Sequence, residues 1–314
     1  MFLSACVVKG RASRQRRTVT AQPSHLQAQI EKISSLSTAP AILMPLLDMM
    51  RLPSEKIRIE KVIELVSCDS AIAAQCLRLA NSPLFGTRYI ETVHSAVLAL
   101  GLERVRSILL GLCVHSMVPP GKWVIAPDAF WRHALGCALV TQQMAEKVEY
   151  PEPEKAYLAG LLHDLGFLVN SMLYTDQFRE CLQRAAEQHL PLHVIEEQVL
   201  GFTHCESGQM LCECWGLPQE FAKAAGCHHD LTLLSGAGPL PILVHHSDLL
   251  CRACSLGYGY DEVLDVESDG GAARRKLLDT HAALANLEMV RLTIGLYGAM
   301  EHIAATVESV FGSR

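Results

Sequence analysis

From about Leu26 to the end of the chain, apolar residues recur at helical spacing, and no segment shows the alternating pattern of a β-strand. Half of the 314 residues are apolar but only 6% are aromatic, so a core must be built mainly from Leu, Ala, Ile, Val and Met. Leu and Ala are among the stronger helix formers. The sequence therefore predicts an all-α fold.

Proline, glycine and capping residues divide this pattern into separate helices. Asp69 is a predicted N-cap, and the helix after it should end at Asn81-Ser82-Pro83 because proline cannot continue it. One helix should open at Pro153 or Glu154 and run through His163-Asp164. The other main predictions are helices at 41–50, 92–100, 102–117, 128–148, 175–188, 191–199, 203–215, 218–228, 239–255, 273–285 and 288–310.

Pro119-Pro120-Gly121 is the clearest break in the chain, and we place the boundary between two packed helical subdomains there. Residues 1–22 combine basic side chains with small polar residues and show no apolar period, which is typical of a disordered basic tail. The predicted organisation is this tail, subdomains at 23–118 and 122–255, and an appendage at 256–314 that starts with a Gly- and Asp-rich loop (257–271).

Charge and hydropathy argue against two classes of partner. The net charge is −6, so no global basic field would hold a nucleic acid or an anionic membrane. No stretch reaches the roughly 18 uninterrupted apolar residues of a membrane span; the best candidate, Ser107–Val118, is short and contains His115. The 12 cysteines are scattered and no export signal is evident, which predicts reduced thiols in a cytoplasmic protein.

Leu161-Leu162-His163-Asp164-Leu165-Gly166 places an imidazole beside a carboxylate in an apolar segment. Burying an unpaired carboxylate costs several kcal/mol, so Asp164 needs a metal, a cation or a set of hydrogen-bond donors. Further candidate ligands lie on successive predicted helices, and a helical bundle can direct them to one centre. These candidates are His133, His204, His228, His229 and Asp248.

Imidazole and carboxylate ligands suit Fe, Mn, Zn, Ni or Co. Two ions about 3.5–4 Å apart would suit phosphate-ester hydrolysis, because they bind phosphoryl oxygens and activate water. Taken singly, each histidine has a simpler explanation, such as a place at a helix end; their ordered set favours a metal centre with one or two divalent ions. The predicted ligands are His133, His163, Asp164 and Asp248 for one ion, and His204, His228 and His229 for a second, with Asp164 bridging.

Other side chains compete for these roles. His245 lies three residues before Asp248, on the same face of the predicted helix, and His246 follows His245, so both histidines are rival candidates to Asp248. Cys251 and Cys254 form a single Cys-x-x-Cys, which is a weak zinc or redox signal without two further ligands. Core packing is the simpler interpretation of these two cysteines.

The segment Leu77–Gly86 (LRLANSPLFG) resembles the signature of HDOD domains, the regulatory branch of the HD metal-phosphohydrolase superfamily. Phe130–His133, Ala159–Gly166, Trp215–Pro218 and His228-His229 resemble the same family in the same order, and the resemblance covers roughly residues 38–250. It implies two packed helical subdomains, the second an HD-type helical bundle, with a regulatory role in bacterial signal transduction. It also places the seven candidate ligands at the metal positions of HD-type phosphodiesterases.

Two departures from the related cyclic di-GMP phosphodiesterases bear on catalysis. Those enzymes carry a lysine three residues after the aspartate of the pair, where this chain has Phe167, which cannot hold a phosphate. The glycine-tyrosine-proline motif expected after the paired histidines is replaced by residues 230–234 (DLTLL). The metal site is therefore expected to persist while the phosphodiesterase chemistry is lost.

Three hypotheses follow, in order of preference. The first is a regulatory module that binds a signalling protein or a nucleotide, holds a metal structurally and has no catalytic residues. The second is a metal-dependent phosphohydrolase, which the complete and ordered set of candidate ligands supports. The third is a redox or metal sensor built on the histidines and cysteines.

Overall fold

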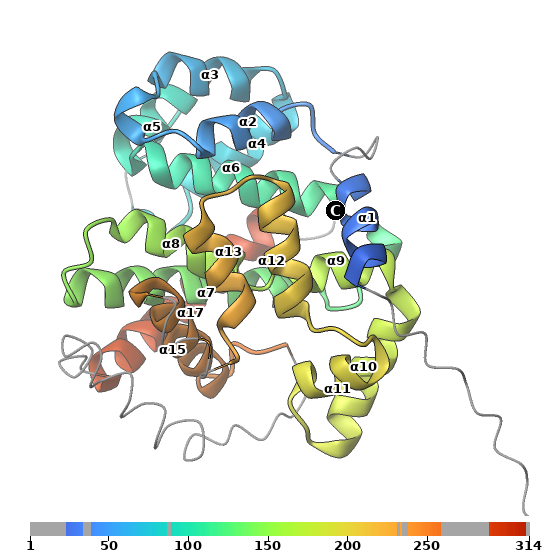
Figure 1. Cartoon of the computed structure of the whole chain (residues 1–314). Helices are drawn as coiled ribbons and strands as arrows, with labels where there is room; N and C mark the ends of the chain where they lie inside the picture. Colours follow the sequence, from blue (N-terminus) through green and yellow to red (C-terminus); the bar gives the residue numbers. More distant parts are fainter. Residues whose placement is uncertain are drawn as a thin grey trace, which may run out of the picture.

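The computed structural model describes residues 23–33, 39–86, 89–230, 233, 238–258 and 289–311. Every regular element in these ranges is helical, and the helices form two packed subdomains (Figure 1). The all-α prediction is therefore confirmed. The predicted basic tail and the predicted helix at 273–285 lie outside the described residues, as does nearly all of the predicted loop at 257–271.

The first group of helices forms the upper part of the molecule in Figure 1. Its longest helix, α6 (Leu102–Met117), is mostly buried and packs against α2, α4 and α5. The surrounding elements are α2 (Leu43–Met50), a 3-10 turn (Ser54–Lys56), α3 (Ile59–Ser67), α4 (Ser70–Ala80) and α5 (Val93–Leu100).

Two predicted helix boundaries in this group have clear physical causes. The carboxylate of Asp69 accepts hydrogen bonds from the backbone N–H of Ala71 at 2.9 Å and of Ile72 at 3.0 Å, so it is the N-cap of α4 as predicted. Gly101 separates α5 from α6 at φ 86°, a backbone conformation that favours glycine.

Asn81 gives the Leu77–Gly86 segment a structural role. Its side chain pairs with both backbone groups of Ile90: Nδ2 donates to the carbonyl and Oδ1 accepts from the N–H, each at 2.7 Å. Nδ2 also donates to the carbonyl of Leu77 at 2.9 Å. These three bonds tie the end of α4 to the segment before α5 and so close the loop between the two helices.

The second group is built around α7 (Pro127–Lys147), which packs against α8, α15 and α17. A 3-10 turn (Pro120–Lys122) precedes it, at the predicted break. The remaining helices are α8 (Pro153–Leu162), α9 (Leu165–Leu173), α10 (Thr175–Gln188), α11 (Leu192–Val199), α12 (His204–Cys214), α13 (Gln219–Cys227) and α15 (Pro239–Ala253). The last helix, α17 (Met289–Phe311), packs against both α7 and α4.

The predicted single helix through His163 and Asp164 is wrong: α8 ends at Leu162 and α9 begins at Leu165. Neighbouring residues of an unbroken helix point about 100° apart. The break allows the two side chains to turn toward one centre. It also coincides with a very close approach, since a Cβ on Gly166 would lie 1.8 Å from the carbonyl oxygen of His204.

The stretch Pro153–Leu173 is long and apolar enough to cross a membrane by length and composition alone. In the structure, 89% of this window is buried inside the protein. It consists of α8 and α9, which pack against α7 and α12 respectively. Its apolar character therefore reflects a place in the core of the second group.

Arg51 links the two groups of helices. Its guanidinium donates to the backbone carbonyls of Trp215 at 2.7 Å and of Gly216 at 3.2 Å, where α12 ends. Gly216 has φ +61°, and a Cβ there would meet the Arg51 guanidinium at 2.6 Å. The glycine of the Trp215–Pro218 motif thus makes room for this contact. On another side of α12, the first helix α1 (Pro23–Ile33) packs against it (Figure 1).

Candidate metal centre

The seven predicted ligands meet in the interior of the second group. Six of them are at most 2% exposed, and the side chain of His229 is 14% exposed. The sequence positions that supply them lie far apart but come together through helix packing. The ligands are His133 on α7, His163 and Asp164 at the α8–α9 break, His204 at the start of α12, His228 and His229 after α13, and Asp248 on α15.

Asp164 lies between two pairs of imidazoles. Its Oδ2 is 3.0 Å from Nε2 of His163 and 3.6 Å from Nε2 of His133. Its Oδ1 is 3.3 Å from Nε2 of His228 and 3.5 Å from Nε2 of His204. A bridging carboxylate needs this arrangement, with one oxygen toward each metal position.

Asp248 reaches the same two positions from α15. Its Oδ1 is 3.3 Å from Nε2 of His133, and its Oδ2 is 3.7 Å from Nδ1 of His229. Oδ2 also forms an ion pair with Arg252 at 2.8 Å. The second carboxylate therefore faces both halves of the cluster, with an arginine to orient it.

Three of the histidines are oriented by backbone carbonyls. In each, Nδ1–H donates to a carbonyl oxygen, which leaves Nε2 directed at the cluster. Such an outer hydrogen bond fixes the tautomer of a metal-binding imidazole. The acceptors are Leu256 for His133 at 2.5 Å, Gly160 for His163 at 2.8 Å and Ala225 for His228 at 2.9 Å.

Glu196 orients the fourth histidine and was not identified from the sequence. Its Oε2 accepts from Nδ1 of His204 at 2.5 Å and from the backbone N–H of His204 at 2.9 Å. Its Oε1 accepts from Nδ2 of Asn170 at 3.1 Å, and Glu196 is 0% exposed. The sequence feature that could have identified Glu196 is an acidic residue on the same face of α11 as the apolar Leu192 and Ile195.

Opposite charges hold the cluster together despite its burial. Burial alone would raise the pKa of Asp164, but His163 and His228 hold it well below its usual range. Burial alone would lower the pKa of His228, but Cys205 and Asp164 raise it to about 10. Arg252 and His133 likewise hold the pKa of Asp248 well below its usual range, against desolvation. Both carboxylates are therefore charged, and positive charge must compensate them.

A buried carboxylate oxygen without a hydrogen-bond partner also indicates that these residues fit a metal. Oδ1 of Asp164 is buried and has no hydrogen-bond partner among the described residues. A buried acceptor without a partner costs about 1–3 kcal/mol. A divalent ion held by this oxygen and the converging Nε2 atoms would remove that cost. Both metal positions therefore have ligands suited to a divalent transition metal.

Tyr258 and Phe167 cover the cluster. The Tyr258 hydroxyl donates a hydrogen bond to Oδ2 of Asp164, and its ring centroid lies 4.6 Å from that of His133. Phe167 packs against Tyr258 at 5.0 Å and against His204 at 4.2 Å. Tyr258 was also not identified from the sequence, because it follows the last ligand-bearing helix and belongs to the predicted appendage.

The competing candidates take other roles. Nδ1 of His245 is 2.6 Å from the carbonyl of His228, so this histidine supports the backbone of a predicted ligand. Nδ1 of His246 faces the carbonyl of Ile242 in its own helix at 2.9 Å. Cys251 and Cys254 are buried, and neither belongs to a metal-competent group of described residues.

A pocket of about 500 Å³ opens beside the cluster, over Cys205 and His229. Its charged lining residues are acidic, and the described lining includes no lysine or arginine. The full lining is His193, Glu197, Thr203, Cys205, Glu206, Gly226, His229, Asp230 and Leu233.

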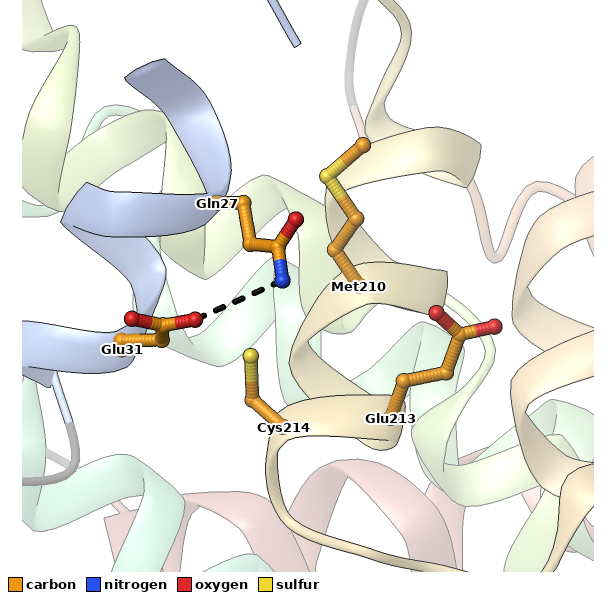
Figure 2. A pocket seen from close by; sticks show the side chains of 5 residues that line it. All are labelled: Gln27, Glu31, Met210, Glu213 and Cys214. Carbon is orange, nitrogen blue, oxygen red and sulfur yellow. Dashed lines mark hydrogen bonds between the residues drawn. The ribbon is translucent and has the colours of Figure 1, made fainter. Parts of the chain in front are cut away.

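A second pocket, of about 420 Å³, lies between α1 and α12 (Figure 2). Figure 2 shows Gln27 and Glu31 on one side of it, joined by a hydrogen bond of 3.4 Å, and Met210, Glu213 and Cys214 on the other. None of these lining residues is a histidine or a basic residue. This pocket therefore offers neither the imidazoles of the metal centre nor a site for phosphate.

Sequence comparison with known proteins finds a relative of this chain. An uncharacterised protein of Treponema pallidum (strain Nichols) is 25% identical over 233 residues, which are 68% of this chain and 43% of that protein. The chain thus matches less than half the length of this relative.

Solved structures show the same fold. An HDOD domain protein of unknown function from Geobacter sulfurreducens has a TM-score of 0.71 and 23% identity, covering 92% of this chain and 99% of the other. A protein from Shewanella amazonensis SB2B whose name assigns it as a phosphohydrolase has a TM-score of 0.69 and 19% identity, covering 91% and 98%. One from Marinobacter aquaeolei VT8, named for signal transduction, has a TM-score of 0.63 and 22% identity, covering 90% and 66%.

At these identities the structural likeness establishes the fold, whereas the match to a family model concerns the sequence itself. The model of the HDOD domain matches residues 36–231, which include both the Leu77–Gly86 segment and the His163-Asp164 pair. Since this match spans more than half of the 314 residues, the chain belongs to the HDOD domain family.

Proposed function

We propose that this HDOD protein is a bacterial, cytoplasmic signalling module that holds one or two divalent metal ions structurally and regulates a protein partner without catalysis. The observation that carries the proposal is the closure of the first metal position by Tyr258, whose hydroxyl hydrogen-bonds Asp164 and whose ring lies against His133. Structural metal sites are closed by protein groups, whereas catalytic sites keep a position open for water or substrate.

The surroundings of the centre do not suit a phosphate. Phe167 takes the position at which related phosphodiesterases carry a lysine, and its ring packs on His204. Arg252, the cation seen beside the ligands, is already ion-paired with Asp248. Phosphoryl groups need a cation or several donors to hold them.

The acidic pocket beside the cluster helps to decide whether the protein binds a nucleotide or a protein partner. Glu197, Glu206 and Asp230 line it, and their carboxylates would repel a nucleotide phosphate. This favours a protein partner over a nucleotide. The regulatory role is in keeping with the name of the Marinobacter protein, which has the same fold.

A metal-dependent phosphohydrolase is the second candidate, favoured by the two carboxylates that face both metal positions. The metal would then supply Lewis-acid activation of a phosphoryl group and of water. Asp164 and Asp248 would hold the ions, and Tyr258 would have to leave Asp164 to admit a substrate.

The deciding experiment measures metal content and turnover together. Protein purified without a metal-affinity column should contain one or two equivalents of Fe, Mn or Zn by inductively coupled plasma mass spectrometry, and Asp164→Ala should lose them. The same protein should hydrolyse no member of a panel of nucleotides, cyclic dinucleotides and phosphomonoesters, with or without added Mn²⁺ or Fe²⁺. Turnover that Asp164→Ala abolishes would replace the first proposal by the second.

A further inference from the structure

We infer that Cys205 is a thiolate ligand of the second metal position, which it forms with His204, His228 and His229, and that this position selects zinc. The inference rests on the metal centre proposed above but goes beyond it: it adds a sulfur ligand and distinguishes the two positions by metal. Neither the family resemblance nor the ordered set of histidines assigns a role to Cys205.

The geometry fits a tetrahedral site. Sγ of Cys205 lies 3.7 Å from Nε2 of His204 and 3.8 Å from Nε2 of His228. Zinc bonds of about 2.3 Å to sulfur and 2.0–2.1 Å to nitrogen put tetrahedral ligands roughly 3.6 Å apart. Together with a nitrogen of His229, these ligand atoms all lie within 4.8 Å of one another. Only small side-chain movements are needed to bring the four atoms onto one ion.

The local backbone supports these ligands. Cys205 follows His204 in the first turn of α12, and a capping box between Thr203 and Glu206 fixes that turn. The Glu206 carboxylate accepts from the backbone N–H of Thr203 at 2.7 Å. Two adjacent ligands therefore come from a rigid helix start, and His204 is held from behind by Glu196 at 2.5 Å.

The two metal positions differ in chemistry. Both positions face a carboxylate oxygen of Asp164 and one of Asp248, and the first, at His133 and His163, combines these oxygens with imidazoles. The second has Cys205 in addition to its imidazoles. Thiolate ligands select soft or borderline ions such as zinc, whereas imidazole with carboxylate also suits Fe or Mn. We therefore expect zinc in the second position and an oxygen-preferring ion in the first.

The second position has a route for a cation. Cys205 and His229 both line the 500 Å³ pocket, and the charged residues around them are Glu197, Glu206 and Asp230. A mouth with carboxylates and no lysine or arginine in its described lining attracts divalent cations and repels anions. The pocket that disfavours a nucleotide is thus suited to loading a metal.

Cys137 is the rival thiol. Its Sγ is 3.4 Å from Nε2 of His133, and it belongs to a metal-competent group with His133, His163 and Asp248. Because its Sγ contacts one predicted histidine ligand, whereas Sγ of Cys205 contacts two, we do not assign it as a ligand. It is the matched control for Cys205, since both are buried thiols next to a predicted histidine ligand.

The test uses the full-length protein, stripped of metal by a chelator and titrated with Co²⁺ as a spectroscopic probe. Bound cobalt should give a thiolate-to-cobalt charge-transfer band in the near ultraviolet. Cys205→Ser should lose this band while keeping the visible bands of cobalt bound to imidazole and carboxylate, and Cys137→Ser should keep both. X-ray absorption of the zinc-loaded wild-type protein should show sulfur at about 2.3 Å from zinc. That measurement decides the matter without any variant if Cys205→Ser fails to fold.

The outcomes separate the inference from the proposed function. Bound metal without a charge-transfer band and without sulfur near zinc would overturn the inference and leave the metal centre standing. Loss of the band in Cys137→Ser rather than in Cys205→Ser would also overturn it. A wild-type protein that binds neither Co²⁺ nor Zn²⁺ would overturn both.

Discussion

The hydroxyl of Tyr258 donates a hydrogen bond to Oδ2 of Asp164, so a residue just beyond the last ligand-bearing helix closes the centre. The same segment fixes His133, whose Nδ1–H donates to the carbonyl of Leu256 at 2.5 Å. The segment Leu256–Tyr258 therefore connects the cover of the centre directly to the orientation of one of its ligands.

Tyr258→Ala should expose the bound metal. Removing the ring uncovers Asp164 and His133, so a chelator should strip the metal roughly tenfold faster than from the wild type, the lower end of typical outer-shell effects. Tyr258→Phe keeps the ring and loses only the hydroxyl, and its rate should lie between the two. The measurement is the rate of metal transfer to a coloured chelator in excess. Equal rates for all three proteins would show that Tyr258 does not close the site.

Glu196→Gln should weaken metal binding at the position of His204. The substitution keeps the size of the side chain but removes the charge that accepts the hydrogen bond from Nδ1 of His204 at 2.5 Å. Loss of such an outer-shell partner costs 10–100-fold in metal affinity as a rule of thumb, i.e. roughly 1.5–3 kcal/mol. Competition with a chelator of known affinity measures the metal affinity of the variant and of the wild type. Glu187→Gln, on the exposed face of α10, is the control and should bind metal as the wild type does.

The fold was predictable largely because its helices carry local signals. Asp69 as an N-cap and Gly101 as a break are visible in the sequence, and the structure confirms both. The helix break before Leu165 was not visible in the sequence, because an apolar segment of helical period continues across it. What interrupts the helix is tertiary packing, namely the contact of Gly166 with the backbone of His204 on α12.

The candidate site was predictable as a set of ligand types but not as a complete environment. Metal-binding side chains are chemically distinctive, so His133 could be proposed from the order of candidate ligands, whereas the choice of Asp248 over His245 rested on the family resemblance. Glu196 and Tyr258 act through hydrogen bonds to a ligand, and no sequence pattern marks such a partner, which lies 8 residues from His204 in one case and 94 residues from Asp164 in the other. Such contacts depend on how α11 packs on α12 and on where the chain runs after α15.

His115→Asn should make the protein less sensitive to acid. Nδ1 of His115 accepts a hydrogen bond from the indole N–H of Trp131 at 3.0 Å, which requires a neutral imidazole. Burial lowers the pKa of His115 from 6.5 to about 4. The folded state therefore resists a proton that the unfolded state accepts. The stability that this provides is full above pH 6.5 and is lost as the pH falls toward 4, by an amount on the order of 3 kcal/mol.

Urea unfolding of wild type and His115→Asn at several pH values between 7 and 4 measures this effect. An asparagine amide can accept the same indole hydrogen bond but does not titrate, so its free energy of unfolding should fall less steeply over this range. The comparison uses the slope against pH, because the smaller asparagine side chain also changes the packing against Trp131 at every pH. Parallel slopes for the two proteins would rule out His115 as a source of acid sensitivity.

Gly166→Ala should damage both the fold and the metal centre. A Cβ at this position would lie 1.8 Å from the carbonyl oxygen of His204 and 2.6 Å from its carbonyl carbon, and both atoms belong to the backbone. Helices α9 and α12 must then separate, which also moves His204 away from Asp164. Overpacking of this kind costs about 1–3 kcal/mol, and more where backbone must shift. The urea concentration at the midpoint of unfolding and the metal content per chain should both be lower than in the wild type.

Gly298→Ala provides the matched control for that substitution. Gly298 is also a helical glycine, on α17, but a Cβ there meets nothing within 4 Å. Alanine is the better helix former by about 1 kcal/mol, so this variant should be as stable as the wild type or more so. It should also retain its full metal content. If the two alanine variants unfolded at the same urea concentration, the close contact between Gly166 and His204 could not be what holds α9 against α12.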